Sequence, residues 1–175
     1  DKTEIIPLGI SDRSTERRAK VRFSKNITNY VLFLGAPRSY KGVQVMIDAF
    51  SVGETQLIIA GDMTEGSAFH LLRGVSHPNI TLVDKPSEDQ KGFLIENSAC
   101  VILPSTEKSE AFGIALLEGA MFGKPLVSTE LGTGTSFVNL NGITGIVVTP
   151  NDPLALRAAV ENIVSSPHVA AYYGN

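Results

Sequence analysis

Two glutamates eight positions apart, Glu110 and Glu118, are the side chains of this 175-residue chain best placed to do chemistry. The apolar run around them predicts a helix over residues 112–122, which ends at a Gly-Lys-Pro stop signal. Over eight helical positions the backbone rises about 12 Å. Two carboxylates at that separation can bind hydroxyl groups at both ends of a polar ligand, such as the sugar and the ribose on either side of a diphosphate.

The start of that helix offers donors for an anion between the two carboxylates. The first N–H groups of a helix have no partner within it, and the helix dipole favours negative charge there. The residues concerned are Phe112, Gly113, Ile114 and Ala115. Plainer interpretations exist, because Glu110 can simply complement the helix dipole and Glu118 can be an exposed helix residue. Glu118 nevertheless lies among apolar residues, where a buried carboxylate needs a partner.

A second candidate loop runs from Gly35 to Gly42 and contains two cations, Arg38 and Lys41. Such a loop, between a predicted strand and a predicted helix, can hold phosphate through its charges and its backbone N–H groups. It is not a P-loop, because Lys41 follows a tyrosine and precedes a glycine, and it lacks the dinucleotide fingerprint. A solvated basic turn is the alternative interpretation. The glycine-rich stretch 132–136 is interpreted as a structural loop.

From residue 29 onward, short apolar runs alternate with helix-like segments, the pattern of βαβ units. We predict strands over residues 30–34, 56–60, 80–83, 100–103, 125–128 and 146–148, and helices over residues 43–50, 67–73, 88–98, 112–122 and 153–164. Continuous apolar strands favour the α/β class: a Rossmann-like three-layer α/β/α sandwich with a mainly parallel sheet of about six strands. Such sheets bind ligands at the carboxyl ends of their strands, where both candidate loops lie.

Composition narrows the function classes further. The formal net charge of -3 argues against a nucleic-acid partner. Cys100 lies alone in an apolar run and is expected in the core, and the histidines lack the spacing of metal ligands, so no metal is expected. No run reaches the roughly 20 apolar residues of a membrane span, and the N-terminus has no secretion signal, which predicts a soluble, cytoplasmic protein.

The N-terminal residues differ from the rest of the chain. Residues 11–25 are polar, carry six Lys or Arg and show no periodicity, which predicts a solvated linker, with contact to an anionic membrane as the alternative. We therefore divide the chain into a hinge or linker, residues 1–28, and one domain, residues 29–175. The chain begins with Asp and ends without a clear boundary, so we expect a domain of a longer protein.

Several segments, taken in order, carry a resemblance to a known family. They are IIPLGI at residues 5–10, VLFLG with YKGVQVMIDAF within 31–50, EAFGIALLE at 110–118, and GKPLVSTELGTGT with NGITGIVVTPNDP within 123–153. They resemble the interdomain hinge, the phosphate loop, the E-x7-E signature and the following segment of the retaining GT-B glycosyltransferases, glycosyl transferases group 1. The chain resembles their C-terminal, donor-binding domain, which is one half of a GT-B fold.

The resemblance implies a role for each candidate residue. Lys41, in the loop that starts at Gly35, would contact the donor diphosphate, and the backbone at residues 112–115 would hold phosphate and sugar. Glu110 would be catalytic at the sugar, and Glu118 would bind the ribose, with no metal or cofactor. The family commonly has arginine after the first glycine of the loop, where this chain has Ala36. Arg38 is the expected substitute, and residues 83–86 are expected to recognise the base.

The resemblance also implies an activity, the transfer of a hexose to a glycan or lipid-linked acceptor in bacterial polysaccharide or lipopolysaccharide synthesis. The first choice of donor is GDP-mannose. The acceptor would bind an N-terminal domain that this chain lacks, so we expect the isolated chain to be inactive. The full-length enzyme is expected in the cytoplasm or peripherally at the inner face of the membrane. A nucleotide-sugar epimerase and a non-catalytic nucleotide-binding module are the alternatives, and the missing fingerprint disfavours an NAD-dependent oxidoreductase.

Overall fold

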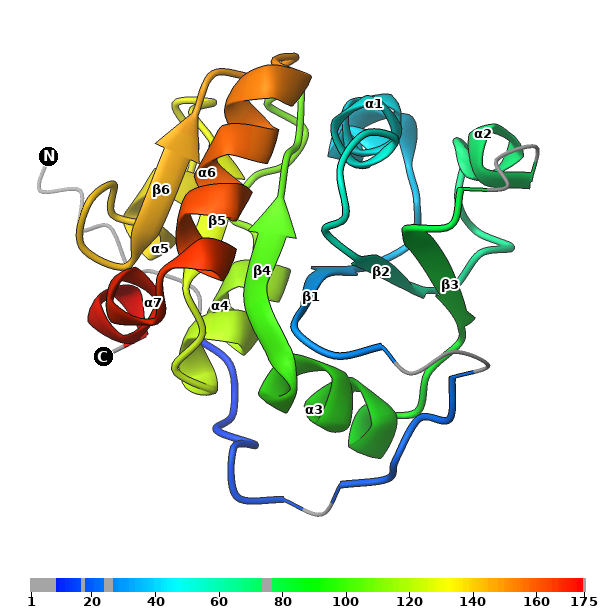
Figure 1. Cartoon of the computed structure of the whole chain (residues 1–175), viewed down its shortest axis with the longest axis horizontal. Coiled ribbons are helices and arrows are strands. Elements are labelled where there is room, and N and C mark those ends of the chain that lie inside the picture. The colour runs from blue at the N-terminus through cyan, green and yellow to red at the C-terminus, as the bar shows by residue number, and fades with distance from the viewer. Residues whose placement is uncertain (1–8, 17, 24–26, 74–76, 175) are drawn as a thin grey trace, which may run out of the picture.

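A parallel sheet lies at the centre of the computed structural model, which describes residues 9–16, 18–23, 27–73 and 77–174. Its strands are β1 (Tyr30–Leu34), β2 (Leu57–Gly61), β3 (Ile80–Asp84), β4 (Ser98–Leu103), β5 (Leu126–Thr129) and β6 (Gly145–Val148). Their order across the sheet is β3-β2-β1-β4-β5-β6, and every neighbouring pair is parallel (Figure 1). The predicted Rossmann-like sheet is therefore confirmed.

Helices cover both faces of this sheet. They are the 3₁₀ helix η1 (Ser39–Lys41) and the α-helices α1 (Val43–Phe50), α2 (Phe69–Arg73), α3 (Glu88–Glu96), α4 (Ile114–Met121), α5 (Thr135–Val138), α6 (Pro153–Ser165) and α7 (Pro167–Tyr173). Right-handed crossovers place α1 and α2 on one face and α3, α4 and α5 on the other. Helix α6 packs against α1 on the first face. This arrangement is the predicted three-layer sandwich.

The central strands form the core because helices cover both of their faces. Every residue of β1, β2 and β5 is buried, whereas the edge strand β3 has no fully buried residue. Cys100 on β4 is completely buried, as predicted, and this burial raises the pKa of its thiol to about 12. Cys100 is thus a core residue and not a reactive thiolate.

The predicted helices and strands are present, with ends that coincide or differ by one or two residues. The largest functional consequence is at α4, which begins at Ile114 and not at Phe112, because Gly113 adopts a left-handed conformation (φ 79°, ψ 59°). Helices α5 and α7 were not predicted. Within the described residues, no helix has the length and apolar character needed to cross a bilayer.

The loops after β1 and β4 are joined where the strand order reverses. The backbone N–H and the hydroxyl of Thr106 donate to the carbonyl of Tyr40, at 2.7 and 3.2 Å. Gly42 has φ 73°, and a Cβ atom there would lie 2.0 Å from the carbonyl oxygen of Pro104, so the close approach of the two loops requires glycine. A reversal of this kind opens a crevice for ligands at the carboxyl ends of the strands.

The basic segment at residues 9–23 packs against the domain, although its described part contains no helix or strand. The N–H of Ala19 donates to the carbonyl of Asp89 on α3 at 3.2 Å, and Val21 and Phe23 are partly buried against the core. The segment therefore does not extend into solvent as the predicted linker would, because its apolar side chains find a surface to cover. Residues 5–8 of the predicted hinge, together with Arg17 and Lys25, lie outside the described residues.

Candidate functional site

A cleft with a volume of about 440 Å³ opens at the carboxyl ends of β1 and β4. Its walls come from the loops that follow β1, β2, β3 and β4 and from the first turns of α3 and α4. We call it the β1/β4 cleft. It lies at the point where the strand order reverses, which is the expected place for a ligand in a sheet of this topology.

Lys41 and Glu110 face each other in this cleft. Lys41 is the last residue of η1, and Glu110 lies in the loop between β4 and α4. The Nζ atom of Lys41 lies 3.6 Å from a carboxylate oxygen of Glu110, and the two side chains are 17% and 11% exposed. Both charges are shielded from most of the solvent yet accessible from the cleft, a setting in which they act more strongly on a ligand than in bulk water.

Hydrogen bonds hold Glu110 and its backbone in place. The buried hydroxyl of Ser105 donates to the Glu110 carboxylate at 3.4 Å. The hydroxyl of Thr133 donates to the carbonyl of Glu110 at 2.9 Å, and the N–H of Gly134 donates to the carbonyl of Ala111 at 2.8 Å. The glycine-rich stretch 132–136 thus supports the segment that leads into α4, in keeping with a structural loop.

The N-terminus of α4 presents backbone donors to the same cleft. Gly113 is left-handed and Ile114 starts the helix, and such a change of hand turns successive N–H groups toward one side. The N–H groups of Leu116 and Leu117 donate to the carbonyl of Gly113. Those of Ile114 and Ala115 come before the first helical hydrogen bond. An anion in the cleft can therefore meet two backbone donors and the positive end of the helix dipole.

Glu118 lies further along the cleft, in the second turn of α4. Its carboxylate has no hydrogen bond or ion pair to any described residue. Burial raises the pKa of Glu118 above its usual value, and the positive charge of Lys91 opposes this effect. A partly buried carboxylate of this kind gains stability when the hydroxyl groups of a ligand supply the missing hydrogen bonds.

The structure brings together most of the side chains and backbone groups predicted to bind a ligand. The residues that line the β1/β4 cleft include Gly35, Lys41, Glu110, Gly113, Ile114, Ala115 and Glu118. Arg38 and Phe112 are not among them. The side chain of Arg38 is exposed at the start of η1, so it does not take the place expected for it in the cleft. The ring of Phe112 packs 6.4 Å from that of Phe137.

Sequence reasoning missed three charged residues of this cleft, Asp62, Glu65 and Lys91. The first two follow β2 and the third lies on α3. Asp62 and Glu65 could have been selected from their position after a strand. However, a charged residue in a loop is usually exposed to solvent and binds no ligand. Lys85 belongs to the stretch expected to recognise the base; it lines the cleft, and its Nζ atom lies 3.5 Å from the Asp62 carboxylate.

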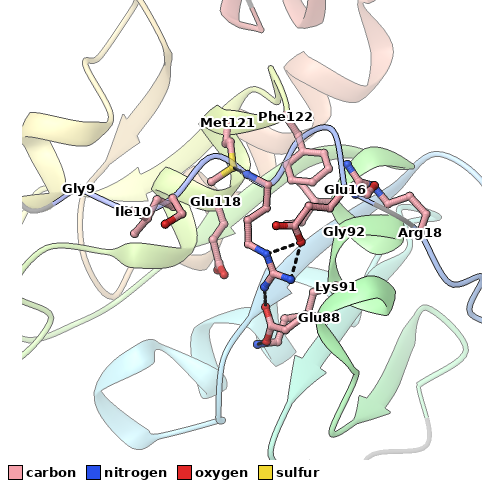
Figure 2. A pocket seen from close by; sticks show the side chains of 13 residues that line it. Gly9, Ile10, Glu16, Arg18, Glu88, Lys91, Gly92, Glu118, Met121 and Phe122 are labelled. Atoms are coloured by element: carbon pink, nitrogen blue, oxygen red, sulfur yellow. Dashed lines mark hydrogen bonds and ion pairs between the residues drawn. The ribbon is translucent and has the colours of Figure 1, made fainter.

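A second cleft, also of about 440 Å³, adjoins the first and lies between α3, α4 and the N-terminal segment. We call it the α3/α4 cleft, and Lys91 and Glu118 line both clefts. Figure 2 shows the side chains of Glu88 and Glu118 directed into this space from α3 and α4, and Arg13 lines it from the N-terminal segment. One Glu88 oxygen lies 2.6 Å from Arg13, and the other lies 2.6 Å from the Nζ atom of Lys91. Glu88 therefore connects the N-terminal segment to the wall of the β1/β4 cleft.

Comparison with curated proteins gives relatives along the whole chain. The D-rhamnosyltransferase WbpZ of Pseudomonas aeruginosa is 34% identical over 179 residues, and the O-antigen chain mannosyltransferase C of Escherichia coli is 34% identical over 180 residues. Both alignments cover 99% of this chain, but they cover 47% and 48% of the relatives. The chain thus spans about half the length of the curated relatives it matches.

Solved structures share the fold. Anabaena Alr3699/HepE in complex with UDP-glucose matches with a TM-score of 0.71 and 20% identity, over 83% of this chain and 42% of that one. The C-terminal domain of the glycosyl transferase group 1 protein LpcC from Francisella tularensis matches with a TM-score of 0.68 and 14% identity, over 97% and 89% of the two chains. The neighbours include glycosyltransferases of the GT-B fold, of which this domain is the predicted half. The family model for Glycosyl transferases group 1 matches residues 14–175, and with relatives at 34% identity the chain belongs to this family.

Proposed function

We propose that the β1/β4 cleft binds a nucleoside diphosphate sugar and that the full-length protein transfers its hexose to a glycan or lipid-linked acceptor. The observation that carries this proposal is the meeting of three groups in one place: the ammonium of Lys41, the carboxylate of Glu110 and the free N–H groups at the start of α4. A diphosphate requires positive charge and N–H donors, and a hexose requires an acceptor for its hydroxyl groups. The cleft supplies both side by side.

The same geometry suits the chemistry of transfer. When the bond between the anomeric carbon and the diphosphate breaks, positive charge develops on the sugar ring and negative charge on the leaving phosphate. Glu110 can stabilise the first charge, and Lys41 with the N–H groups of Ile114 and Ala115 can stabilise the second. The acceptor hydroxyl then forms the new bond to the anomeric carbon, and its proton passes to an oxygen of the departing diphosphate. The E-x7-E resemblance supports retention of the anomeric configuration.

The orientation of the donor follows from the two carboxylates. With the hexose at Glu110 and the diphosphate at Lys41, the ribose lies toward Glu118, whose carboxylate is without a partner among the described residues. The base then lies toward Lys85 and Pro86, which line the same cleft. Each polar part of the donor thereby meets a group that can hydrogen-bond it.

For the hexose we propose mannose, carried by GDP. The two 34% identical relatives are named for mannose and for D-rhamnose, which is 6-deoxymannose, so both names point to a sugar of manno configuration. Initial rates of the full-length protein with GDP-mannose, GDP-6-deoxymannose and UDP-glucose test this choice. Faster transfer from UDP-glucose than from both GDP-sugars would contradict it.

Binding to the cleft itself is tested by calorimetry of this chain with GDP, UDP, ADP and NAD. We expect preference for one nucleoside diphosphate, and binding of NAD alone would show that the proposed function is wrong. Lys41→Ala should lower the affinity for the preferred nucleotide roughly 10- to 100-fold, because the substitution removes a charge-assisted hydrogen bond to phosphate. The matched control is Lys20→Ala, whose side chain is exposed and outside both clefts, and it should bind as the unaltered chain does.

The acceptor half of the reaction requires the full-length protein, since the chain spans about half of its relatives. Transfer of hexose from a GDP-sugar to a lipid-linked glycan is followed by mass spectrometry of the product. Interconversion of one free nucleotide sugar into another would indicate an epimerase. Nucleotide binding without any turnover would indicate a non-catalytic module.

A further inference from the structure

We infer that Lys91 on α3 is the second cation for the donor diphosphate, and that it contacts the phosphate nearer the ribose. The inference rests on the proposed function and deepens it. A donor diphosphate carries two negative charges, and one cation of the β1/β4 cleft, Lys41, is shared with Glu110. Position 36 is alanine, and Arg38 does not line the cleft. A second positive charge must therefore come from another wall of the cleft.

Two further lysines line the cleft, Lys85 and Lys91. The side chain of Lys85 is 55% exposed, and it lies on the loop after β3 beside Asp62. The side chain of Lys91 is 32% exposed, and it extends from α3, whose hydrogen bonds fix its backbone. A charge that is less exposed to water and held on a helix interacts more strongly with a bound phosphate. These differences favour Lys91.

Lys91 is also at the right end of the cleft. It lines both clefts together with Glu118, the residue proposed to bind the ribose. Both Lys91 and Lys41 are close enough to Glu118 to oppose the effect of burial on its pKa. A donor that extends from the hexose at Glu110 to the ribose at Glu118 meets Lys41 beside Glu110 and Lys91 in the wall that also contains Glu118.

The partner of Lys91 allows it to turn toward a phosphate at little cost. Its Nζ atom lies 2.6 Å from one oxygen of Glu88, and the other oxygen of Glu88 lies 2.6 Å from Arg13 (Figure 2). When Lys91 moves to a phosphate, Glu88 keeps Arg13 as its partner, so no carboxylate is left unpaired. Arg13 is in turn held by Glu16, at 2.6 Å.

The test measures the affinity of the full-length protein for GDP-mannose, GDP, GMP and guanosine, with the UDP series substituted if the calorimetric screen selects UDP. We expect Lys91→Met to lower the affinity for GDP-mannose, GDP and GMP roughly 10- to 100-fold, because a charge-assisted hydrogen bond to phosphate is lost. Guanosine should bind with unchanged affinity. Lys91→Arg should restore most of the loss. The slope of log Kd against log salt should fall in Lys91→Met, because one fewer cation contacts phosphate.

Two matched variants make the result specific. Lys20→Met removes an exposed lysine outside the clefts and should change GDP affinity less than threefold. Lys85→Met removes the lysine proposed to lie beside the base, so any loss of affinity that it causes should be equal for GDP and guanosine. The inference is wrong if Lys91→Met binds GDP as tightly as the unaltered protein, if Lys85→Met loses affinity for GDP and not for guanosine, or if guanosine binding falls equally in Lys91→Met. If Lys91→Met does not fold, the test uses Lys91→Gln instead, because glutamine is neutral and keeps most of the length of the lysine side chain.

Failure of this inference is distinguishable from failure of the proposed function. If Lys41→Met weakens GDP-mannose binding and Lys91→Met does not, the donor site stands and only the role of Lys91 is wrong. If the unaltered protein binds no nucleoside diphosphate sugar, the proposed function itself is wrong.

Discussion

The two ends of the β1/β4 cleft each contain a glutamate, but the protein surrounds the two carboxylates differently. Glu110 has a cation, a hydroxyl donor to its carboxylate and a glycine-rich loop that is hydrogen-bonded to its carbonyl. Glu118 sits on the regular helix α4 with no partner among the described residues, and burial raises its pKa. One carboxylate is held in a fixed position before any ligand arrives, whereas the other is stabilised only when a ligand supplies donors.

This difference matches the roles proposed for the two residues. A group that stabilises charge during a reaction is most effective when it is already in position, since no reorganisation is then needed at the moment of reaction. A carboxylate that binds a ribose can instead lack hydrogen-bond donors in the free protein, because the hydroxyl groups of the ribose supply them. The difference predicts that neutralising the two glutamates will have opposite consequences for the stability of the protein.

The largest expected effect is at the sugar end. In the full-length protein, Glu110→Gln should lower kcat about 100- to 1,000-fold with a much smaller change in donor affinity, because a preorganised charge beside the reacting carbon is lost. It should also lower the free energy of unfolding, since Lys41 loses its partner. Steady-state kinetics and denaturant unfolding measure the two quantities. Full activity in Glu110→Gln would show that the sugar end is wrongly assigned.

The control for that variant is Glu161→Gln. Glu161 is exposed on α6, outside both clefts, and carries the same side chain. We expect it to leave kcat and stability unchanged, so a loss common to both variants would point to net charge and not to the site.

At the ribose end we expect a loss of donor affinity, which is smaller than the loss of kcat in Glu110→Gln, and a gain in stability. Glu118→Gln should weaken donor binding roughly 10-fold, because hydrogen bonds from hydroxyl groups to a charged acceptor are replaced by weaker ones. In the absence of donor it should unfold at a higher denaturant concentration than the unaltered chain, because a partly buried charge without a partner is removed.

The gain in stability should depend on pH in a defined direction. The folded-state pKa of Glu118 is raised above 4.5, so the folded state binds more protons than the unfolded state as the pH rises from 4.5 through the raised pKa. The free energy of unfolding of the unaltered chain therefore falls across that pH window, whereas that of Glu118→Gln does not fall for this reason. The two proteins should be equally stable below pH 4.5 and differ above the window. Unfolding curves from pH 4 to pH 8 measure this, and a difference that is constant with pH would contradict it.

The smallest expected effect concerns the support of Glu110. Thr133→Val removes the hydroxyl that donates to the carbonyl of Glu110 while it keeps the shape of the side chain. We expect a loss of about 1 kcal/mol in the free energy of unfolding, and a fall in Tm of about 2–4 °C for a chain of this size. Thermal unfolding followed by circular dichroism measures it. The control is Thr28→Val, at an exposed position. An equal loss of stability in both variants would show that the hydrogen bond from Thr133 has no special role in supporting Glu110.

The fold was predictable because its signals are local. Continuous apolar runs, the helix-like segments between them and the Gly-Lys-Pro stop signal appear within short windows of sequence, and the strands and helices that they predict are present. Helix α5 was missed because four residues are too few for a periodic pattern. The shifted start of α4 depends on the conformation of Gly113, since either hand is open to a glycine.

The candidate site was predicted in part. Lys41 and Glu110 each follow a strand, and the rule for ligand sites in parallel sheets was enough to select them. Arg38 was selected as a cation of the loop after the first strand and as the substitute for the arginine of the family, but its side chain is exposed outside the cleft. Lys91 was not selected, because its approach to Glu118 depends on the packing of α3 beside α4, which no short window of sequence records.

The sequence by itself determined the α/β class, the order of strands and helices, and the two loops that carry Lys41 and Glu110, because hydrophobic period and turn residues act over a few positions. Only the tertiary structure decided that these two side chains lie 3.6 Å apart, that Glu118 is without a partner among the described residues, and that Lys91 joins both clefts. These features depend on contacts between residues far apart in the chain. Burial and charge at such contacts are properties of the packed molecule and not of any single segment.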